Sequence, residues 1–232
     1  MDRREELQLN LSEVQSDIAQ ACADFGRDKS EVKLIVVTKT WPASDVDFLA
    51  GLGVTDVGEN RDQEAKPKRD SVHADSLTWH AIGQLQTNKA KSVAGWADVV
   101  HSVDRPDLVK ALAKAVTDRV NPLGVLMQVN LDEISDGNRG GSASSEAMEL
   151  VAMIMHTPGL QLHGVMGVAP LVGDAQTAFA KLQEVSNQVR AMEPSANWIS
   201  AGMSGDYRQA LKFGATHLRI GSSILGNRAF QG

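Results

Sequence analysis

The sequence predicts an α/β fold: a single (β/α)8 TIM barrel with an extra N-terminal helix, residues 1–232 forming one domain. Short apolar segments alternate with helical segments along the chain, and eight apolar segments can be counted. These segments are continuously apolar, as is typical of parallel strands covered on both faces. The length of 232 residues is close to the ~250 that one such barrel uses.

Residues 2–26 are expected to form the extra helix. Apolar side chains recur there at spacings of three and four residues, at Leu7, Leu11, Val14, Ile18 and Cys22. This spacing places them along one face of a helix, and Gly26 is positioned to end that helix.

The eight expected strands cover residues 33–38, 54–58, 78–82, 97–101, 123–129, 161–167, 197–200 and 216–220. The expected helices between them cover residues 43–52, 60–70, 87–95, 105–118, 143–157, 174–192 and 205–214. An open doubly wound sheet is the alternative with the same order of elements. Its G-x-G-x-x-G loop does not follow the first strand, which exits as Thr38-Lys39-Thr40-Trp41-Pro42, so the barrel is preferred.

The composition argues against several classes of protein. There are 23 Lys and Arg against 29 Asp and Glu, a net charge of −6, so we expect no nucleic-acid partner. The single cysteine, Cys22, cannot form an internal disulfide, and the start of the chain is charged where a signal peptide is apolar. The longest apolar run, residues 34–37, is too short to cross a membrane. We therefore expect a cytoplasmic protein without a membrane segment.

Motifs of common metal and hydrolase sites are missing from the sequence. H-E-x-x-H, G-x-S-x-G and G-x-x-x-x-G-K-S/T do not occur. The histidines lack zinc-type spacing and no calcium loop is present, so no metal is expected. A long acidic, glycine-rich segment at residues 130–141 is expected to form a mobile lid over the barrel mouth.

Candidate functional residues lie where strands end, because (β/α)8 barrels place their chemistry there. Lys39 follows the first strand, where a partly desolvated amine could attack a carbonyl; a lysine that only extends into solvent is the alternative. Arg219 ends the last strand, and Gly221 and Ser222 follow at the start of a short helix that could bind phosphate. Ser200 ends the seventh strand and is expected at the same corner. The alternative is that these serines and glycines only form turns.

Two further strand exits are polar. Glu59 and Asn60 follow the second strand and could equally cap the next helix, and Thr87 could start the helix after the third strand. His80 lies inside the third strand, where we expect a histidine satisfied in the barrel interior rather than a general base.

Six segments in this order carry a resemblance to a known family: VVTKTWP, DVGENRDQEA, WHAIGQLQTNKAK, GVMGVAP, ISAGMSGDYRQAL and HLRIGSSILG. From about Lys33 to Phe230 the chain resembles the pyridoxal 5′-phosphate homeostasis protein family, which is similar to the N-terminal barrel domain of alanine racemases. The resemblance implies that pyridoxal phosphate forms a Schiff base with Lys39. It further implies a phosphate held by Ser200, Gly221 and Ser222, a pyridine nitrogen facing Arg219, and a ring near Asn60.

Three positions depart from the family pattern: Ala201, Ala81 and Arg61 stand where methionine, phenylalanine and tyrosine are common. An arginine at the pyridine nitrogen disfavours protonation of the ring and makes it a weaker electron sink. Alanine racemases add a tyrosine from a C-terminal domain of the partner subunit. The sole tyrosine here, Tyr207, lies in the predicted seventh helix after the 202–206 loop.

These features predict a non-catalytic protein with pyridoxal phosphate as its cofactor, acting in intracellular vitamin B6 homeostasis. No catalytic residue is assigned, pyridoxal-phosphate-dependent apo-enzymes are the expected recipients, and a monomer is expected. One alternative is an amino-acid racemase that uses Lys39 as one of two bases. Another is a barrel that binds a different phosphorylated metabolite, with Lys39 acting only as a charge.

Overall fold

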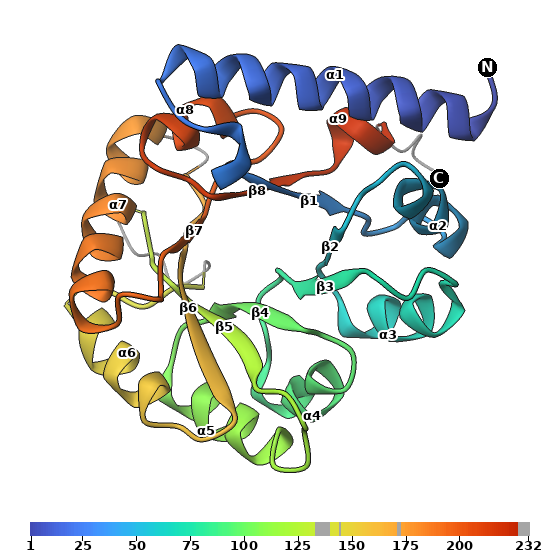
Figure 1. Cartoon of the computed structure of the whole chain (residues 1–232). Coiled ribbons are helices and arrows are strands. Elements are labelled where there is room, and N and C mark those ends of the chain that lie inside the picture. Colours follow the sequence, from blue (N-terminus) through green and yellow to red (C-terminus); the bar gives the residue numbers. More distant parts are fainter. Residues whose placement is uncertain (133–139, 144, 171–172, 227–232) are drawn as a thin grey trace.

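The computed structural model describes residues 1–132, 140–143, 145–170 and 173–226, and within them the predicted barrel is confirmed (Figure 1). Eight parallel strands pair in chain order, and β8 returns to pair with β1. The strands are β1 Lys33–Val37, β2 Asp56–Glu59, β3 Thr78–Ala81, β4 Val99–Val103, β5 Leu123–Gln128, β6 Leu160–Met166, β7 Trp198–Ser200 and β8 His217–Ile220.

Helices surround this barrel as an outer ring (Figure 1). They are α2 Ala43–Gly51, α3 Asp62–Ser71, α4 Ala90–Ala94, α5 Pro106–Ala115, α6 Ala147–Met155, α7 Ala175–Met192 and α8 Tyr207–Lys212. Short 3₁₀ turns cover Lys29–Glu31 and Thr87–Lys89, and the four-residue helix α9 Ser222–Leu225 follows β8. No helix in the described ranges has both the length and the apolar character that a membrane crossing needs.

Many element boundaries differ from the predicted ones by one to four residues, and two of these differences have a clear physical cause. β4 begins at Val99 rather than at residue 97, because the Ala97 N–H still donates to Val93 O, 2.8 Å away, and so extends the preceding helical turn. Helix α6 begins at Ala147 rather than at residue 143, because Ser142 pairs beside β5 through its N–H and Gln128 O, 2.8 Å apart. Most of the predicted lid at 130–141, namely residues 133–139, lies outside the described residues.

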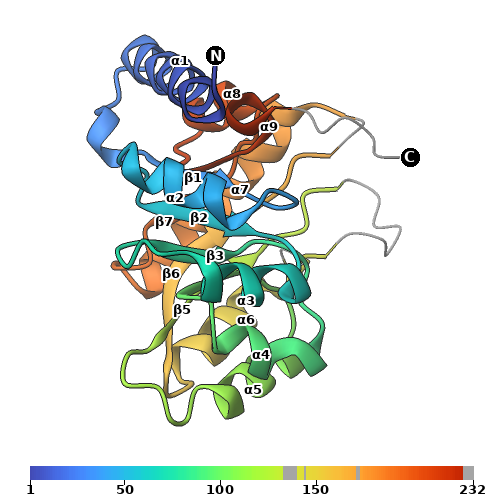
Figure 2. The same ribbon diagram turned by 90° about the vertical axis from the view of Figure 1, so that its right-hand side faces the viewer.

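The extra N-terminal helix, α1 Arg3–Asp24, is confirmed and lies outside the ring, across α2, α8 and α9 (Figures 1 and 2). A capping box between Asp2 and Glu5 begins it. Asn10 Nδ2 donates to Ile224 O at 2.9 Å, and an Arg3 guanidinium nitrogen donates to Leu225 O at 3.0 Å. The carbonyl end of α9, which has no intrahelical partners, is therefore held by side chains of α1.

The two faces of the barrel sheet bury different sets of side chains, because successive strand residues point to opposite faces. Val100 and Val125 belong to the large apolar core that also contains the helix residues. Their strand neighbours Val99 and Leu126 form a separate small cluster with Met166. Most apolar burial thus lies between strands and helices.

A bulge in β6 shapes the barrel where this strand lies between β5 and β7. The register pairs Val125 with Leu162 and then Leu126 with Gly164, so His163 has no counterpart on β5. Gly164 has φ +149°, and a Cβ built there would lie 2.0 Å from Trp198 O. Only glycine fits this close approach of β6 to β7.

We predict that Gly164→Ala lowers the free energy of unfolding by about 3 kcal/mol or more, because the new methyl group would overlap backbone. Urea denaturation followed by circular dichroism measures the change. Gly51→Ala is the matched control, since a Cβ at Gly51 in α2 meets nothing within 4 Å and should change stability by less than about 1 kcal/mol. Equal stability of the two variants would contradict the role given to the bulge.

Candidate functional site

A cavity of about 500 Å³ lies at the carboxyl ends of β1, β2 and β8. Five of the six residues singled out from the sequence line it: Lys39, Asn60, Arg219, Gly221 and Ser222. They come from segments far apart in the chain and are brought together by the pairing of β8 with β1 and of β1 with β2. The cavity therefore combines an amine, a guanidinium and hydroxyl groups.

Ser200, the sixth residue, does not line this cavity. It is fully buried at the end of β7, where its Oγ lies 2.9 Å from His101 Nδ1 and accepts a hydrogen bond from Arg219 at 2.6 Å. The serine that reaches the predicted phosphate corner is Ser204, whose Oγ accepts from Ser222 Oγ at 3.2 Å. The sequence pointed to the loop after β7, but strand alternation, which turns Ser200 inward, decides which of its serines faces the cavity.

The corner formed by Ser204, Gly221 and Ser222 offers several hydrogen-bond donors. The first N–H groups of a helix have no intrahelical partner, which applies to Ser222 and the residue after it in α9. A Cβ at Gly221 would lie 3.0 Å from Val37 O, so glycine lets this turn approach β1 closely. This close approach places the corner next to the end of β1, two residues before Lys39.

The two residues that flank Lys39 are held through their backbone groups by side chains of α3. The carbonyl of Thr38 accepts from Lys68 Nζ at 2.8 Å, and the N–H of Thr40 donates to Glu64 Oε1. Thr40 has φ +69°, an unusual conformation for a β-branched residue. These bonds fix the backbone on both sides of Lys39.

The group behind these bonds, which we call the Lys68 cluster, consists of Glu59, Glu64 and Lys68. Lys68 is buried and donates to Glu59 Oε1 at 2.6 Å and to Glu64 Oε1 at 2.9 Å. Burial raises the pKa of Glu59, an effect that the hydrogen bond and charge of Lys68 oppose. Glu59 does not cap α3, whose N-cap residue is Arg61. Sequence reasoning missed this cluster, although Glu64 and Lys68 stand four residues apart in the predicted helix.

Arg219 is buried and still reaches the cavity. Besides Ser200 it donates to Gly167 O at 2.9 Å. Burial lowers the pKa of Arg219 to about 10, so the guanidinium stays charged near neutral pH. No carboxylate of the described residues forms an ion pair with it. Two hydrogen bonds to uncharged acceptors therefore orient a buried cation.

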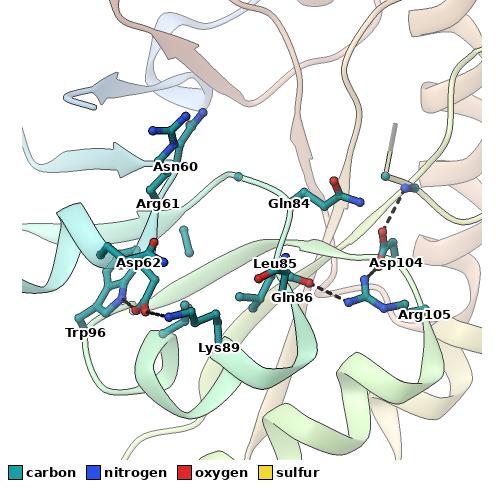
Figure 3. Close-up of a pocket in the computed structure, with 16 residues that line it drawn as sticks. Asn60, Arg61, Asp62, Gln84, Leu85, Gln86, Lys89, Trp96, Asp104 and Arg105 are labelled. Atoms are coloured by element: carbon teal, nitrogen blue, oxygen red, sulfur yellow. Dashed lines mark hydrogen bonds and ion pairs between the residues drawn. The ribbon is translucent and has the colours of Figure 1, made fainter. Parts of the chain in front are cut away.

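Figure 3 shows a second cavity, of about 620 Å³. It shares Asn60 with the first cavity. Four of its charged side chains form two ion pairs: Lys89 lies 3.8 Å from Asp62, and Arg105 lies 2.6 Å from Asp104. Asp62 also accepts from Trp96 Nε1 at 3.0 Å. Within the described residues, no cluster of three potential metal ligands occurs here or elsewhere. The cavity that contains Lys39 is thus the stronger candidate for a cofactor site.

Comparison with known proteins shows the family of the chain. Residues 10–229 match the family model "Alanine racemase, N-terminal domain". The pyridoxal phosphate homeostasis protein of Mycobacterium bovis is 41% identical over 98% of this chain and 95% of its own length. That of Corynebacterium glutamicum is 37% identical over 93% and 99%.

Solved structures share the fold. PipY of Synechococcus elongatus, solved with PLP bound, aligns with a TM-score of 0.78 and 29% identity, over 90% of this chain and 100% of that one. The alanine racemase of Corynebacterium glutamicum aligns with a TM-score of 0.72 and 13% identity, over 99% of this chain and 62% of that one, and shows the fold alone. On the identity and coverage of its relatives, the chain belongs to the pyridoxal phosphate homeostasis protein family.

Proposed function

We propose that this chain binds pyridoxal phosphate covalently through Lys39 and acts in vitamin B6 homeostasis by holding and releasing the cofactor without turnover. The observation that carries the proposal is the presence of Lys39, Arg219 and Ser222 in one cavity. Pyridoxal phosphate has an aldehyde, a pyridine nitrogen and a phosphate, and these three groups need an amine, a fixed partner and hydrogen-bond donors.

Each lining residue has a distinct role in this proposal. Lys39 Nζ supplies the amine, and the Lys68 cluster holds the backbone that carries it. Gly221, Ser222 and Ser204 supply N–H and hydroxyl donors to the phosphate, Arg219 faces the pyridine nitrogen, and Asn60 lies beside the ring. When bound, pyridoxal phosphate supplies an aldehyde that reacts reversibly with amines.

Two features support a protein that holds the cofactor rather than one that uses it for catalysis. Of the described residues that line the cavity, Lys39 and Arg219 alone have side chains that gain or lose a proton, and racemisation needs a second proton donor or acceptor on the opposite face of the substrate. Tyr207 lies in α8 and is not among the lining residues. In addition, the charge of Arg219 disfavours a protonated pyridine ring. The proposal also includes delivery of the cofactor to apo-enzymes in the cytoplasm. It further includes a monomeric state of the protein.

The covalent linkage is tested by spectroscopy. We expect the native chain to turn yellow with pyridoxal phosphate, and Lys39→Ala to stay colourless, because the amine that forms the linkage is gone. The control is Lys89→Ala, which removes a lysine from the neighbouring cavity and should leave the colour unchanged. Borohydride reduction followed by peptide mass analysis should find the modification on Lys39; modification on another lysine would overturn the assignment.

The Lys68 cluster is tested by Lys68→Met. Removing the ammonium leaves the Thr38 carbonyl and two carboxylates without their shared donor, which should weaken pyridoxal phosphate binding at least about tenfold. Amide hydrogen exchange at Thr40 should also become faster. Lys66→Met, an exposed position in the same helix, is the matched control. Unchanged affinity and exchange in Lys68→Met would show that the cluster does not hold the Lys39 segment.

The absence of turnover is tested by incubating the loaded protein with alanine or serine in deuterium oxide. We expect no wash-in of deuterium at the α-carbon by NMR, because the cavity offers no second base beyond Lys39 among the described residues. Exchange that disappears in Lys39→Ala would favour the racemase alternative.

A further inference from the structure

Inside the barrel, the side chains of Ser200, His101 and His80 link Arg219 to the carboxylate of Asp56. We call Asp56, His80, His101 and Ser200 the histidine network. We propose that this network consists of positioning residues that hold the Arg219 guanidinium in a single orientation toward the cofactor ring. The inference rests on the proposed function, in which Arg219 faces the pyridine nitrogen.

The network is continuous and short in every link. Arg219 donates to Ser200 Oγ at 2.6 Å, and Ser200 Oγ lies 2.9 Å from His101 Nδ1. His101 Nε2 lies 2.9 Å from His80 Nδ1, and His80 Nε2 lies 3.0 Å from Asp56 Oδ1. The five residues lie on β2, β3, β4, β7 and β8, so the links cross the interior of the barrel. All five are buried, none more than 4% exposed.

The donor character of arginine, together with the need of the buried Ser200 hydroxyl for an acceptor, assigns a direction to every link. A guanidinium only donates, so Ser200 Oγ accepts from Arg219, and its own hydrogen has one acceptor within reach, His101 Nδ1. Burial lowers the pKa of His101 well below its ordinary value, and the charge of Arg219 lowers it further, so the ring is neutral. Because Nδ1 accepts from Ser200, the ring hydrogen of His101 is on Nε2. His80 Nδ1 must then accept, and the hydrogen on His80 Nε2 points to Asp56.

Asp56 is the charged end of the network. Burial alone would raise the pKa of Asp56, but hydrogen bonds from His80 and Thr55, with the charge of Lys33, hold it below the usual range. The network therefore runs from a buried cation to a buried carboxylate, with each dipole aligned in the same direction. Hydrogen bonds aligned in this way strengthen one another in a medium of low dielectric constant.

This arrangement explains how Arg219 remains oriented without an ion pair. Ser200 and Gly167 O hold one side of the guanidinium, which leaves its other N–H groups for the cavity. A neutral ring nitrogen can accept from them, whereas a protonated ring would face a like charge. Other ionisable groups in the interior, His163 and His217, have no hydrogen bond to the network.

The first test uses the native protein without cofactor. ¹⁵N NMR of histidine should show hydrogen on Nε2 in both His80 and His101, with no titration of His101 over the pH range in which exposed histidines titrate. The resonances of the exposed His73 and His156 serve as the references in the same spectra. Hydrogen on His101 Nδ1, or titration of His101 with the exposed histidines, would overturn the assigned direction.

The second test uses pyridoxal phosphate labelled with ¹⁵N in the ring. In His101→Leu we expect the yellow linkage to Lys39 to persist, affinity to fall about tenfold, and the ring-nitrogen resonance to move toward that of a protonated pyridine. Asp56→Asn keeps an acceptor for His80, removes the charge, and should shift the resonance in the same direction. His163→Leu is the control, because His163 stacks on Trp198 with ring centres 4.3 Å apart and lies outside the network.

The outcomes separate the two proposals. An unchanged ring-nitrogen resonance in folded His101→Leu and Asp56→Asn, or an equal shift in His163→Leu, would overturn the positioning role while leaving cofactor binding intact. Failure of the native chain to bind pyridoxal phosphate at Lys39 would overturn the proposed function and this role with it. If His101→Leu does not fold, Asp56→Asn and the histidine measurement decide.

Discussion

The pairing of β8 with β1 is the interaction on which the site depends. It aligns Ile35 with Arg219 and Val36 with Ile220, so the chain leaves both strands at the same edge of the barrel. Lys39 and Ser222 are far apart in the sequence and become neighbours only through this closure. Without that pairing, the Lys39 amine and the phosphate corner would remain far apart, although each sequence segment would be unchanged.

The same closure surrounds a partly polar interior. Barrels of this type usually fill the interior with layers of branched apolar side chains, and the cluster of Val99, Leu126 and Met166 is such a region. Arg219, His101 and their partners lie in the interior as well, together with His163 and His217. Burying a guanidinium is unfavourable unless its donors are satisfied, and each link of the histidine network satisfies one donor with one acceptor. The polar interior thus accommodates a buried cation, Arg219, that reaches the cavity from inside the barrel.

Support for the cavity also comes from outside the barrel. The Lys68 cluster holds the backbone on both sides of Lys39 and compensates the unfavourable φ of Thr40 with a hydrogen bond to its N–H. On the opposite side, α1 holds the end of α9 through Asn10 and Arg3. Arg3 also lies over the ring of Trp41, 4.4 Å from its centre. Arg3 therefore contacts both the end of α9 behind the phosphate corner and the segment that follows Lys39.

The sequence by itself determined the order of strands and helices, the N-terminal helix and most of the cavity, because apolar periodicity and strand exits are local properties. It predicted Lys39, Asn60, Arg219, Gly221 and Ser222, which all line one cavity, and it placed His80 in the interior. Only the tertiary structure decided that Ser200 turns inward to Arg219 while Ser204 faces the cavity, and that Glu59 pairs with Lys68 instead of capping a helix. These outcomes depend on which side chains meet across the barrel, and no local pattern encodes contacts between residues about a hundred positions apart, such as His101 and Ser200.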